Sequence, residues 1–391
     1  MLSKVKSTQK WLLQFLPEHR RIASSLLDSL HIITTEDMIE DLKLFIEEIA
    51  NNDTECSALL PIREVTPQES IYNEENPNAS PLLQASQESL GSEAFISNLY
   101  TNLNRSKPNK YRQPRVNIGG ENRQISPSIE FMKQHRFKHL FLVDDLIGSG
   151  DRVVKYLNAL LKNKTINSWV SYGFLKIHIV SFMATQNGKK VVLKRINGRN
   201  NISLHIIHHA PSIHELPNNK DIIYLCEAYA HKQVRYPLGY KDCAVRVVFT
   251  HSAPNNLPSI LHYQVENNYR PSKNLNLKVN QWHALFPFRT ITSQFKHDVT
   301  KIKSQSSPKH DILSLLTLIE SGINNRNSLA NIMNKSQAYI QTICTLCEDY
   351  DFISNNNNVL KITDDGRAEL ATKTHLETVL AKSVNFYYPR Q

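Results

Sequence analysis

The sequence predicts an α/β fold with a mostly parallel sheet, preceded by an N-terminal helical segment and followed by a C-terminal winged helix-turn-helix domain. Two observations carry this prediction. Strand-like apolar runs alternate with helical patterns between residues 139 and 250, as they do in parallel sheets. From about residue 309, three short helical patterns precede two strand-like runs, which is the order of a winged helix. The expected boundaries are 1–54 for the helical segment, 55–300 for the α/β domain and 307–391 for the winged helix.

The N-terminal part is predicted to combine helices with long polar connections. Two amphipathic helices are expected between residues 8 and 50, and Thr34 suits the start of the second. The elements expected next are a short strand over 58–65, a long loop over 66–93, a helix over 95–103 and a polar connection over 105–123 that contains Gly119 and Gly120.

The central part is predicted to alternate between strands and helices. The expected strands cover residues 139–143, 175–184, 202–208 and 244–250, and the expected helices cover residues 152–161 and 221–233. This alternation favours a mostly parallel sheet with helices packed on it.

The C-terminal part is predicted to hold helices over 311–320, 329–333 and 336–349, strands around 352–353 and 359–362, and a last helix capped by Thr363. The third helix and the wing would face a nucleic-acid groove, although the low net charge of this part predicts weak DNA affinity. A protein-docking role is the alternative, and we favour DNA. Cys344 and Cys347 have the spacing of a metal pair but are predicted to be core. The predicted nucleic-acid-binding residues are Lys335, Ser336, Gln337, Tyr339, Gln341 and Lys361.

The composition is that of an ordinary globular chain, with 391 residues of which 40% are hydrophobic and 21% charged. No apolar run approaches the roughly 18 to 20 residues of a membrane helix, so no membrane partner is expected. The N-terminus is unlike a cleavable signal peptide, and the five scattered cysteines do not suggest a disulfide framework. We therefore expect a cytoplasmic protein.

Charge is distributed unevenly within the net value of +10. Residues 1–100 hold 7 basic and 16 acidic side chains, residues 101–300 hold 29 and 11, and residues 301–391 hold 10 and 9. The basic middle favours polyanions, either phosphorylated small molecules or nucleic acid. One basic run is interpreted as a solvated face or as a surface that follows a nucleic acid, and we favour the second; it consists of Lys189, Lys190, Lys194, Arg195 and Arg199.

The strongest local signal is an apolar strand that ends in two acids, followed by a turn of small residues and a helix. Acids at the carboxyl end of a parallel strand lie where such sheets bind ligands. Glycines in the turn let backbone N–H groups approach an anion, and the helix directs its positive end at the same point. The combination suits a sugar phosphate; the alternative is that the acids only end a strand and cap a helix. The predicted catalytic residues are Asp144 and Asp145, and the predicted phosphate-binding residues are Gly148, Ser149, Gly150, Asp151 and Arg152.

This motif resembles the ribose-phosphate signature of type I phosphoribosyltransferases, and the resemblance implies their mostly parallel sheet. That family usually has Thr where this chain has Arg152, so Arg152 either replaces the hydroxyl with a charge or indicates a different ligand. The pyrophosphate loop of the family has two candidate positions here, after the strand over 58–65 and around Gly91, Ser92 and Glu93.

The segments 251–258 and 282–287, followed by the winged helix, are similar to phosphoribosyltransferase-like proteins of bacterial conflict systems. Among these, the chain resembles the effector of retron antiphage defence. The resemblance implies a toxic ribosyltransferase-like effector that acts on a nucleotide or ribose phosphate and is held inactive by a reverse transcriptase and its RNA-linked single-stranded DNA. Three residues are candidates for the substrate pocket: Ser92, Asn255 and Asn256.

The chemistry stays open at this point. The chain is interpreted either as a ribosyltransferase or nucleotide glycosidase, or as a ligand-sensing transcriptional regulator with an inactive domain; a non-catalytic scaffold is a third reading. Mg²⁺ would enter bound to a phosphorylated substrate, and no metal site made of protein ligands is predicted.

Overall fold

The computed structural model describes residues 1–51, 54–66, 68–81, 92–118, 121–216, 219–273, 275, 279–305, 308–333, 335–356 and 359–371. The chain forms two compact units, Met1–Lys296 and His297–Gln391, and α11 (Ser293–Gln305) contains the boundary between them. Within these ranges, no helix is long and apolar enough to span a membrane.

The centre of the first unit is a four-stranded parallel sheet, so the predicted α/β class is confirmed. Its strands are, in spatial order, β2 (Ser57–Pro61), β5 (His139–Ile147), β6 (Lys176–Ala184) and β7 (Ile202–His209). The strand of the motif was expected to end at Val143, but every residue of β5 as far as Ile147 is buried and most of them pair with β6. The two acids therefore lie within a strand instead of after it.

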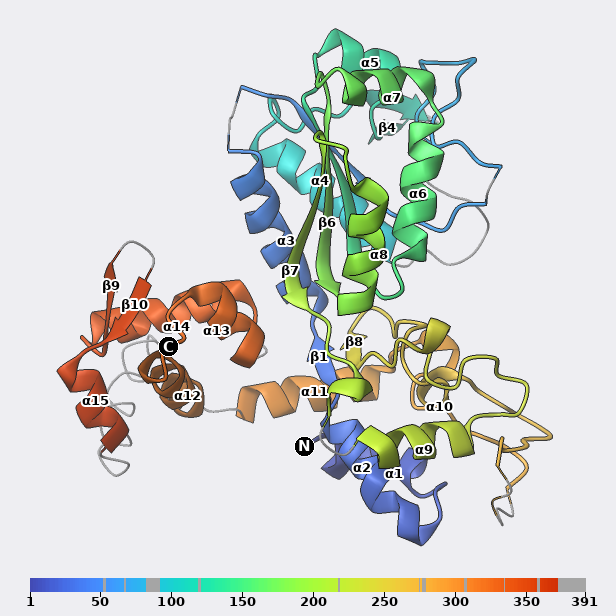
Figure 1. Cartoon of the computed structure of the whole chain (residues 1–391), viewed down its shortest axis with the longest axis vertical. Helices are drawn as coiled ribbons and strands as arrows, with labels where there is room; N and C mark the ends of the chain where they lie inside the picture. Colours follow the sequence, from blue (N-terminus) through green and yellow to red (C-terminus); the bar gives the residue numbers. More distant parts are fainter. Residues whose placement is uncertain are drawn as a thin grey trace. The chain divides into compact units, whose positions relative to one another are not determined.

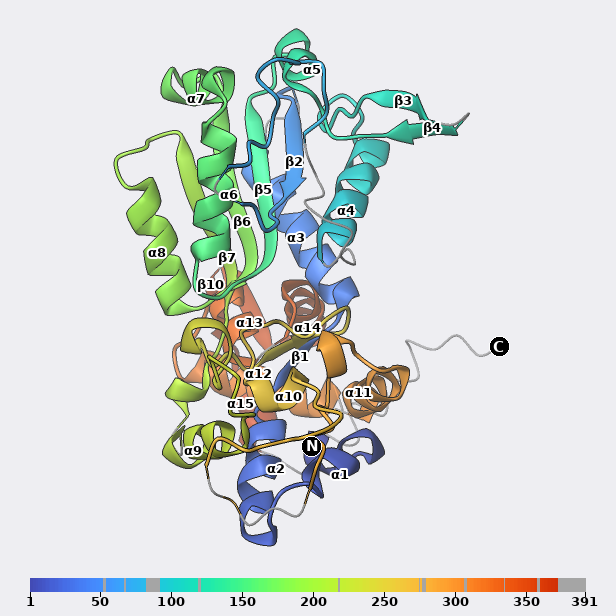
Figure 2. The same ribbon diagram turned by 90° about the vertical axis from the view of Figure 1, so that its right-hand side faces the viewer.

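Helices cover both faces of this sheet (Figures 1 and 2). One face carries α3 (Thr35–Ile49) and α4 (Ser92–Ser106), and the other carries α6 (Asp151–Leu161) and α8 (Gln186–Ile196). The Thr34 hydroxyl accepts a hydrogen bond from the N–H of Asp37 at 3.1 Å, which confirms the predicted start of α3.

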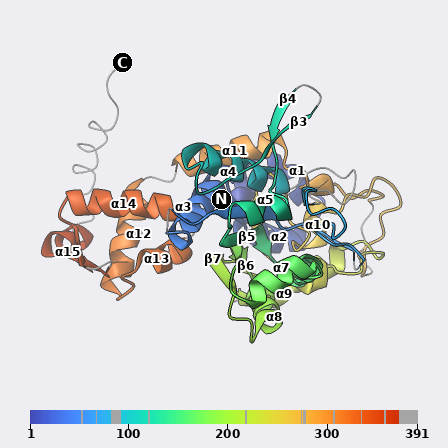
Figure 3. The same cartoon turned by 90° about the horizontal axis from the view of Figure 1, so that it is seen from above.

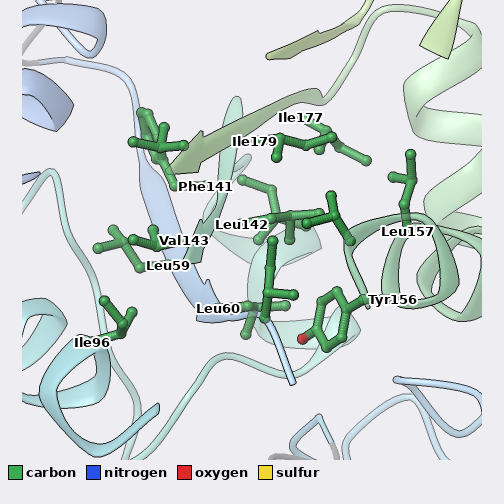
Figure 4. Close-up of a cluster of buried hydrophobic side chains, with 14 of the residues drawn as sticks. Leu59, Leu60, Ile96, Phe141, Leu142, Val143, Tyr156, Leu157, Ile177 and Ile179 are labelled. Atoms are coloured by element: carbon green, nitrogen blue, oxygen red, sulfur yellow. The ribbon is translucent and has the colours of Figure 1, made fainter. Parts of the chain in front are cut away.

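The core lies on both sides of the strands (Figure 4). Ile96 of α4 approaches the sheet from one side, while Tyr156 and Leu157 of α6 approach it from the other. Because β5 is central and covered on both faces, its residues form a nearly continuous apolar run that only the two acids interrupt.

The N-terminal residues belong to the same unit as the sheet. The first expected helix is divided into α1 (Lys6–Leu12) and α2 (Arg20–Asp28), because Pro17 begins a separate 3-10 turn between them. A strand that was not expected, β1 (His31–Ile33), pairs in parallel with β8 (Val247–Phe249). The run over 244–250 therefore contributes to this small sheet and not to the main one.

Several elements were absent from the sequence prediction. The polar connection over 105–123 contains an antiparallel hairpin of β3 (Arg115–Ile118) and β4 (Glu121–Gln124), which projects from the unit in Figure 3. Gly119 and Gly120 lie outside the described residues. The other helices of this unit are α5 (Ile129–Gln134), α7 (Lys164–Ser171), α9 (Asn219–Tyr229) and α10 (Ser259–His262), of which only α9 was expected.

The second unit has the predicted order of a winged helix. Its elements are α12 (Pro308–Glu320), α13 (Arg326–Met333), α14 (Gln337–Asp349), the antiparallel strands β9 (Ile353–Asn356) and β10 (Val359–Ile362), and α15 (Asp364–Ala371). The hydroxyls of Ser336 and Thr363 accept the N–H groups of Tyr339 and Gly366, so both predicted caps are confirmed. Cys344 and Cys347 are buried in the apolar core, as expected.

Candidate active site

A cleft of about 820 Å³ opens at the carboxyl edge of the main sheet. β2 ends at Pro61, which lies opposite Val143 of β5. Beyond Val143, β5 therefore pairs with β6 alone, and residues 144–147 line the cleft. The two acids therefore lie where β5 extends beyond the end of β2 and borders the cleft.

Distant segments of the chain meet around this cleft, and the candidate residues chosen from the sequence lie together in it. The lining includes both acids, the five residues of the turn and helix start, and the three pocket candidates, namely Asp144, Asp145, Gly148, Ser149, Gly150, Asp151, Arg152, Ser92, Asn255 and Asn256. One candidate position for a pyrophosphate loop also contributes, through Ser92 and Glu93 at the start of α4. Arg63 and Glu64, which lie within the segment expected to be the first strand, line the cleft as well. Gly91 lies outside the described residues.

One guanidinium serves both acids. Nη2 of Arg152 lies 2.5 Å from Oδ1 of Asp144 and 3.3 Å from Oδ1 of Asp145. Nε2 of His251 lies 3.3 Å from the second oxygen of Asp145. The second oxygen of Asp144 is buried and has no hydrogen-bond partner among the described residues, and the residue as a whole is only 1% exposed. The cleft thus contains one buried carboxyl oxygen available to a ligand.

The environment separates the acidities of the two carboxyl groups. Burial raises the pKa of Asp144 well above its ordinary value, and the neighbouring Asp145 raises it further, against the lowering effect of Arg152. Burial also acts to raise the pKa of Asp145, but the hydrogen bond with His251 and the charge of Arg152 lower it below its ordinary value. The pair therefore combines a carboxyl group whose pKa is raised with one whose pKa is lowered.

The turn after β5 is packed so closely that it requires glycine. A Cβ on Gly148 would lie 2.4 Å from the side chain of Asn256, and a Cβ on Gly150 would lie 2.9 Å from the carbonyl oxygen of Gly188. Gly150 also has φ +84°, which L-residues rarely adopt. The hydroxyl of Thr185 donates to the carbonyl oxygen of Gly148 at 2.6 Å and holds the turn against the start of α8.

The residues at the start of α6 have roles within the protein that the sequence did not show. Arg152, expected to bind phosphate, pairs with the acids. Asp151 forms an ion pair with Lys241 and lies 3.5 Å from the hydroxyl of Tyr240. These contacts connect the turn to the segment around residue 240, on the other side of the cleft.

Sequence reasoning missed several lining residues. His251 could have been found, because it follows directly after a predicted strand. No sequence pattern marks Phe288 and Arg289 as lining residues. Both have positive φ values, 50° and 66°, although neither is glycine. Arg289 is held there because its Nε donates to the carbonyl oxygen of Ala253 at 2.7 Å, while the N–H of Ala253 donates to the carbonyl oxygen of Arg289 at 2.9 Å.

Comparison with known families agrees with this geometry. Residues 8–287 match the PRTase-CE family. The chain belongs to the PRTase-CE family. The matched region includes the whole main sheet, both acids and the turn that follows them. Residues 313–391 match a second family, described as wHTH-PRTase associated. No curated protein matches the chain.

The PRTase-CE domain fits a magnesium ion only in part. Among the described residues, no group of three or more His, Cys, Asp or Glu side chains is arranged to hold a metal. Oxygen is the ligand that Mg²⁺ prefers, and the unpartnered oxygen of Asp144 could supply one. This single oxygen could contribute to the ligand shell of such an ion.

The winged helix that follows the PRTase-CE domain is of a type that suggests DNA binding. Lys335 and Tyr339, expected to face a groove, instead contact Oδ2 of Asp311 within the domain, at 2.7 and 2.8 Å. Ser336 caps α14. The side chain of Gln337 is partly buried, whereas Gln341 and Lys361 are exposed.

Proposed function

We propose that the PRTase-CE domain binds a nucleotide or ribose phosphate in the cleft and acts at its anomeric carbon, as a ribosyltransferase or a nucleotide glycosidase. The observation that carries this proposal is one cleft in which Asp144 and Asp145 lie beside a glycine turn that leads into α6. Carboxyl groups suit ribose hydroxyls, and a glycine turn at a helix start suits a phosphate.

Binding would exchange the partners of Arg152. In the free protein its guanidinium holds both acids, and it sits in the first turn of α6, next to the proposed phosphate site. A phosphate on the turn competes for this guanidinium, because charged oxygens of phosphate accept strong hydrogen bonds from arginine. Movement of Arg152 toward the phosphate would free the acids for the ribose hydroxyls.

The chemistry would rest mainly on Asp145. Cleavage at the anomeric carbon develops positive charge, and a carboxylate that stays ionised stabilises it. The unpartnered oxygen of Asp144 is placed to contact the sugar. Magnesium carried by the substrate would offset charge on a leaving pyrophosphate.

The decisive experiment compares nucleotide pools by mass spectrometry in cells that express the chain or the double variant Asp144→Asn, Asp145→Asn. The matched control is Asp41→Asn, which alters another buried aspartate, paired with His208 at 3.0 Å and outside the lining of the cleft. We expect one nucleotide to fall, or a ribosylated product to form, with the intact chain and the control only. Identical pools in all strains, with the purified chain still binding ribose 5-phosphate, would contradict catalysis.

A ligand-sensing regulator is the second candidate, and the position of Arg152 favours it. Arg152 occupies both acids until a ligand binds. The protein would then have two arrangements, one with Arg152 on the acids and one with Arg152 released, and a ligand could shift the balance between them. In that case ribose 5-phosphate would change the affinity of the full chain for duplex DNA. Asp144→Asn would abolish the change without abolishing DNA binding.

We further propose that the chain is an effector of a retron-type antiviral system, controlled by a reverse transcriptase and its RNA-linked DNA. The pairing of a PRTase-CE domain with a winged helix of its associated family, and the resemblance noted above, support this proposal. Growth of cells that express the chain alone should be arrested, and co-expression of the reverse transcriptase with its RNA should restore it. Equal growth in both strains would contradict the proposal.

A further inference from the structure

One helical layer of the first unit carries positive charge and, apart from Asp151 at the start of α6, no acidic side chain. Residues 152–214 contain ten Lys and Arg residues and no Asp or Glu. This stretch includes α6, α7 and α8. A solvated helix face normally mixes both signs, because opposite charges three or four residues apart stabilise a helix. The composition of this layer therefore points to a polyanion outside the chain.

The charges lie on neighbouring helices and on the residues that follow α8. α6 and α8 lie on the same face of the sheet (Figures 1 and 2), and Nε of Arg195 donates to Oδ1 of Asn158 at 2.7 Å, which joins the two helices. Arg199 follows α8. Burial lowers the pKa of Arg195, and the nearby positive charge of Arg199 lowers it further. We call the following residues the basic face: Lys155, Lys189, Lys190, Lys194, Arg195 and Arg199. Among the described residues, none of them forms an ion pair with an acidic side chain.

Two exposed aromatic rings lie at the end of this face. Tyr172 is 76% exposed and Phe174 is 60% exposed, with ring centroids 6.1 Å apart. The turn that holds them is tied to the end of the basic face, because Nδ2 of Asn201 donates to the carbonyl oxygen of Val170 at 2.8 Å. Large aromatic side chains so exposed are typical of surfaces on which other rings stack.

We infer that the basic face and the rings of Tyr172 and Phe174 bind single-stranded nucleic acid. Lysine and arginine neutralise the phosphates, and unpaired bases stack on the aromatic rings. A duplex offers the same phosphates but keeps its bases stacked inside, so the rings favour a single strand. The cations at the end of α8 also stabilise that helix through its dipole, but this accounts for Lys194 and Arg195 only. The inference goes beyond the proposed function and does not depend on the cleft.

The test measures binding of the full chain to a fluorescently labelled single strand of about 20 nucleotides, as DNA and as RNA, over a range of salt concentrations. The first variant is Lys190→Ala, Lys194→Ala, Arg199→Ala. Its matched control, Lys4→Ala, Lys6→Ala, Lys10→Ala, removes the same charge from exposed positions elsewhere in the unit. We expect the first variant to lose at least about tenfold in affinity and to reduce the slope of log K against log salt by about 2, since each phosphate contact contributes about 0.7.

A second variant, Tyr172→Ala, Phe174→Ala, separates single strands from duplexes. It should weaken single-strand binding about tenfold without changing the salt slope, and should leave duplex binding unchanged. Equal losses in the basic-face variant and its control would show that only the overall charge matters and would overturn the inference. So would tighter binding to duplex that neither variant alters, because the winged helix would then be the site. Thermal unfolding checks that these surface variants stay folded.

Discussion

Two buried aspartates, one in each unit, bind cationic side chains in different ways. In the winged helix, one oxygen of Asp311 accepts from both Lys335 and Tyr339, at 2.7 and 2.8 Å. In the cleft, one guanidinium is shared by Asp144 and Asp145, and an oxygen of Asp144 has no partner. Buried polar atoms are normally satisfied, so an unsatisfied one beside a cleft indicates a ligand. We therefore expect Asp144 to bind a ligand and Asp311 to stabilise the fold.

The largest difference should appear in turnover. Asp144→Asn keeps the size of the side chain but replaces the unpartnered carboxyl oxygen, which is placed to contact the sugar, with an amide nitrogen. We expect it to reduce the rate of nucleotide conversion by about 10²- to 10⁴-fold. Asp311→Asn should leave the rate unchanged. The rates are measured with purified full-length proteins on the nucleotide that the pool comparison identifies. A comparable loss in both variants would mean that Asp144 acts only through folding.

The glycines of the two units give the next contrast. Gly150 in the cleft and Gly322 in the winged helix both have positive φ, at +84° and +94°. A Cβ on Gly150 would strike backbone, whereas no atom of the part of the chain that the structure describes lies within 4 Å of one on Gly322. Alanine should therefore cost about 1–2 kcal/mol of unfolding free energy at Gly322, from strain alone, and distinctly more at Gly150.

The measurement can assign each effect to its unit. The three tryptophans, Trp11, Trp169 and Trp282, lie in the first unit, so their fluorescence follows its unfolding in urea. Calorimetry follows both units. Equal losses at the two glycines would show that the turn after β5 relaxes to admit a side chain, and that its close packing is not needed.

We expect Asp311 to contribute more than Asp144 to stability, whereas Asp144 contributes more to activity. Asp311→Ala leaves the ammonium of Lys335 and the hydroxyl of Tyr339 without their common acceptor, and we expect the winged helix to lose about 1–3 kcal/mol. Asp144→Asn removes an acid that burial disfavours in its charged form, so the first unit should lose little stability or gain some. A large loss from Asp144→Asn would show that its pair with Arg152 is mainly structural.

The contrast also shows which parts of the molecule the sequence could predict. The winged helix was predicted almost completely, because local signals define it: the hydroxyls of Ser336 and Thr363 cap helices, and Gly322 follows one. The acids and the glycine turn were found for the same reason. The pairing of β1 with β8 joins residues 31 and 247, which no local pattern connects.

The partners of the candidate residues were equally beyond local reasoning. Arg152 was assigned to phosphate from its place in a motif, and its distance from Asp144 depends on how β5 extends past β2. Lys335 was assigned to a groove, although Asp311, which it contacts, lies one helix earlier. Spacing along the chain identifies residues that can carry a function, but tertiary contacts decide which of their atoms remain available for it.

The last contrast concerns pH, because the two acids of the cleft affect stability on opposite sides of pH 3.8. The folded pKa of Asp144 is raised, so its contribution to stability is complete below its ordinary value of 3.8 and is lost as pH rises through the folded value. The folded pKa of Asp145 is lowered, so its contribution is present above 3.8 and is lost as pH falls. The two contributions change on opposite sides of pH 3.8, so their sum is greatest near that pH. The difference in unfolding free energy between wild type and Asp144→Asn isolates the contribution of Asp144.

We therefore expect Asp144→Asn to gain stability relative to wild type as pH rises above 3.8, with a slope of at most about 1.4 kcal/mol per pH unit for one proton. Urea unfolding followed by tryptophan fluorescence from acid to neutral pH measures this difference. A difference that does not change with pH would mean that Arg152 keeps Asp144 ionised in the folded protein. The unpartnered oxygen would then belong to a second carboxylate, and both acids, instead of Asp145 alone, would stabilise positive charge at the anomeric carbon.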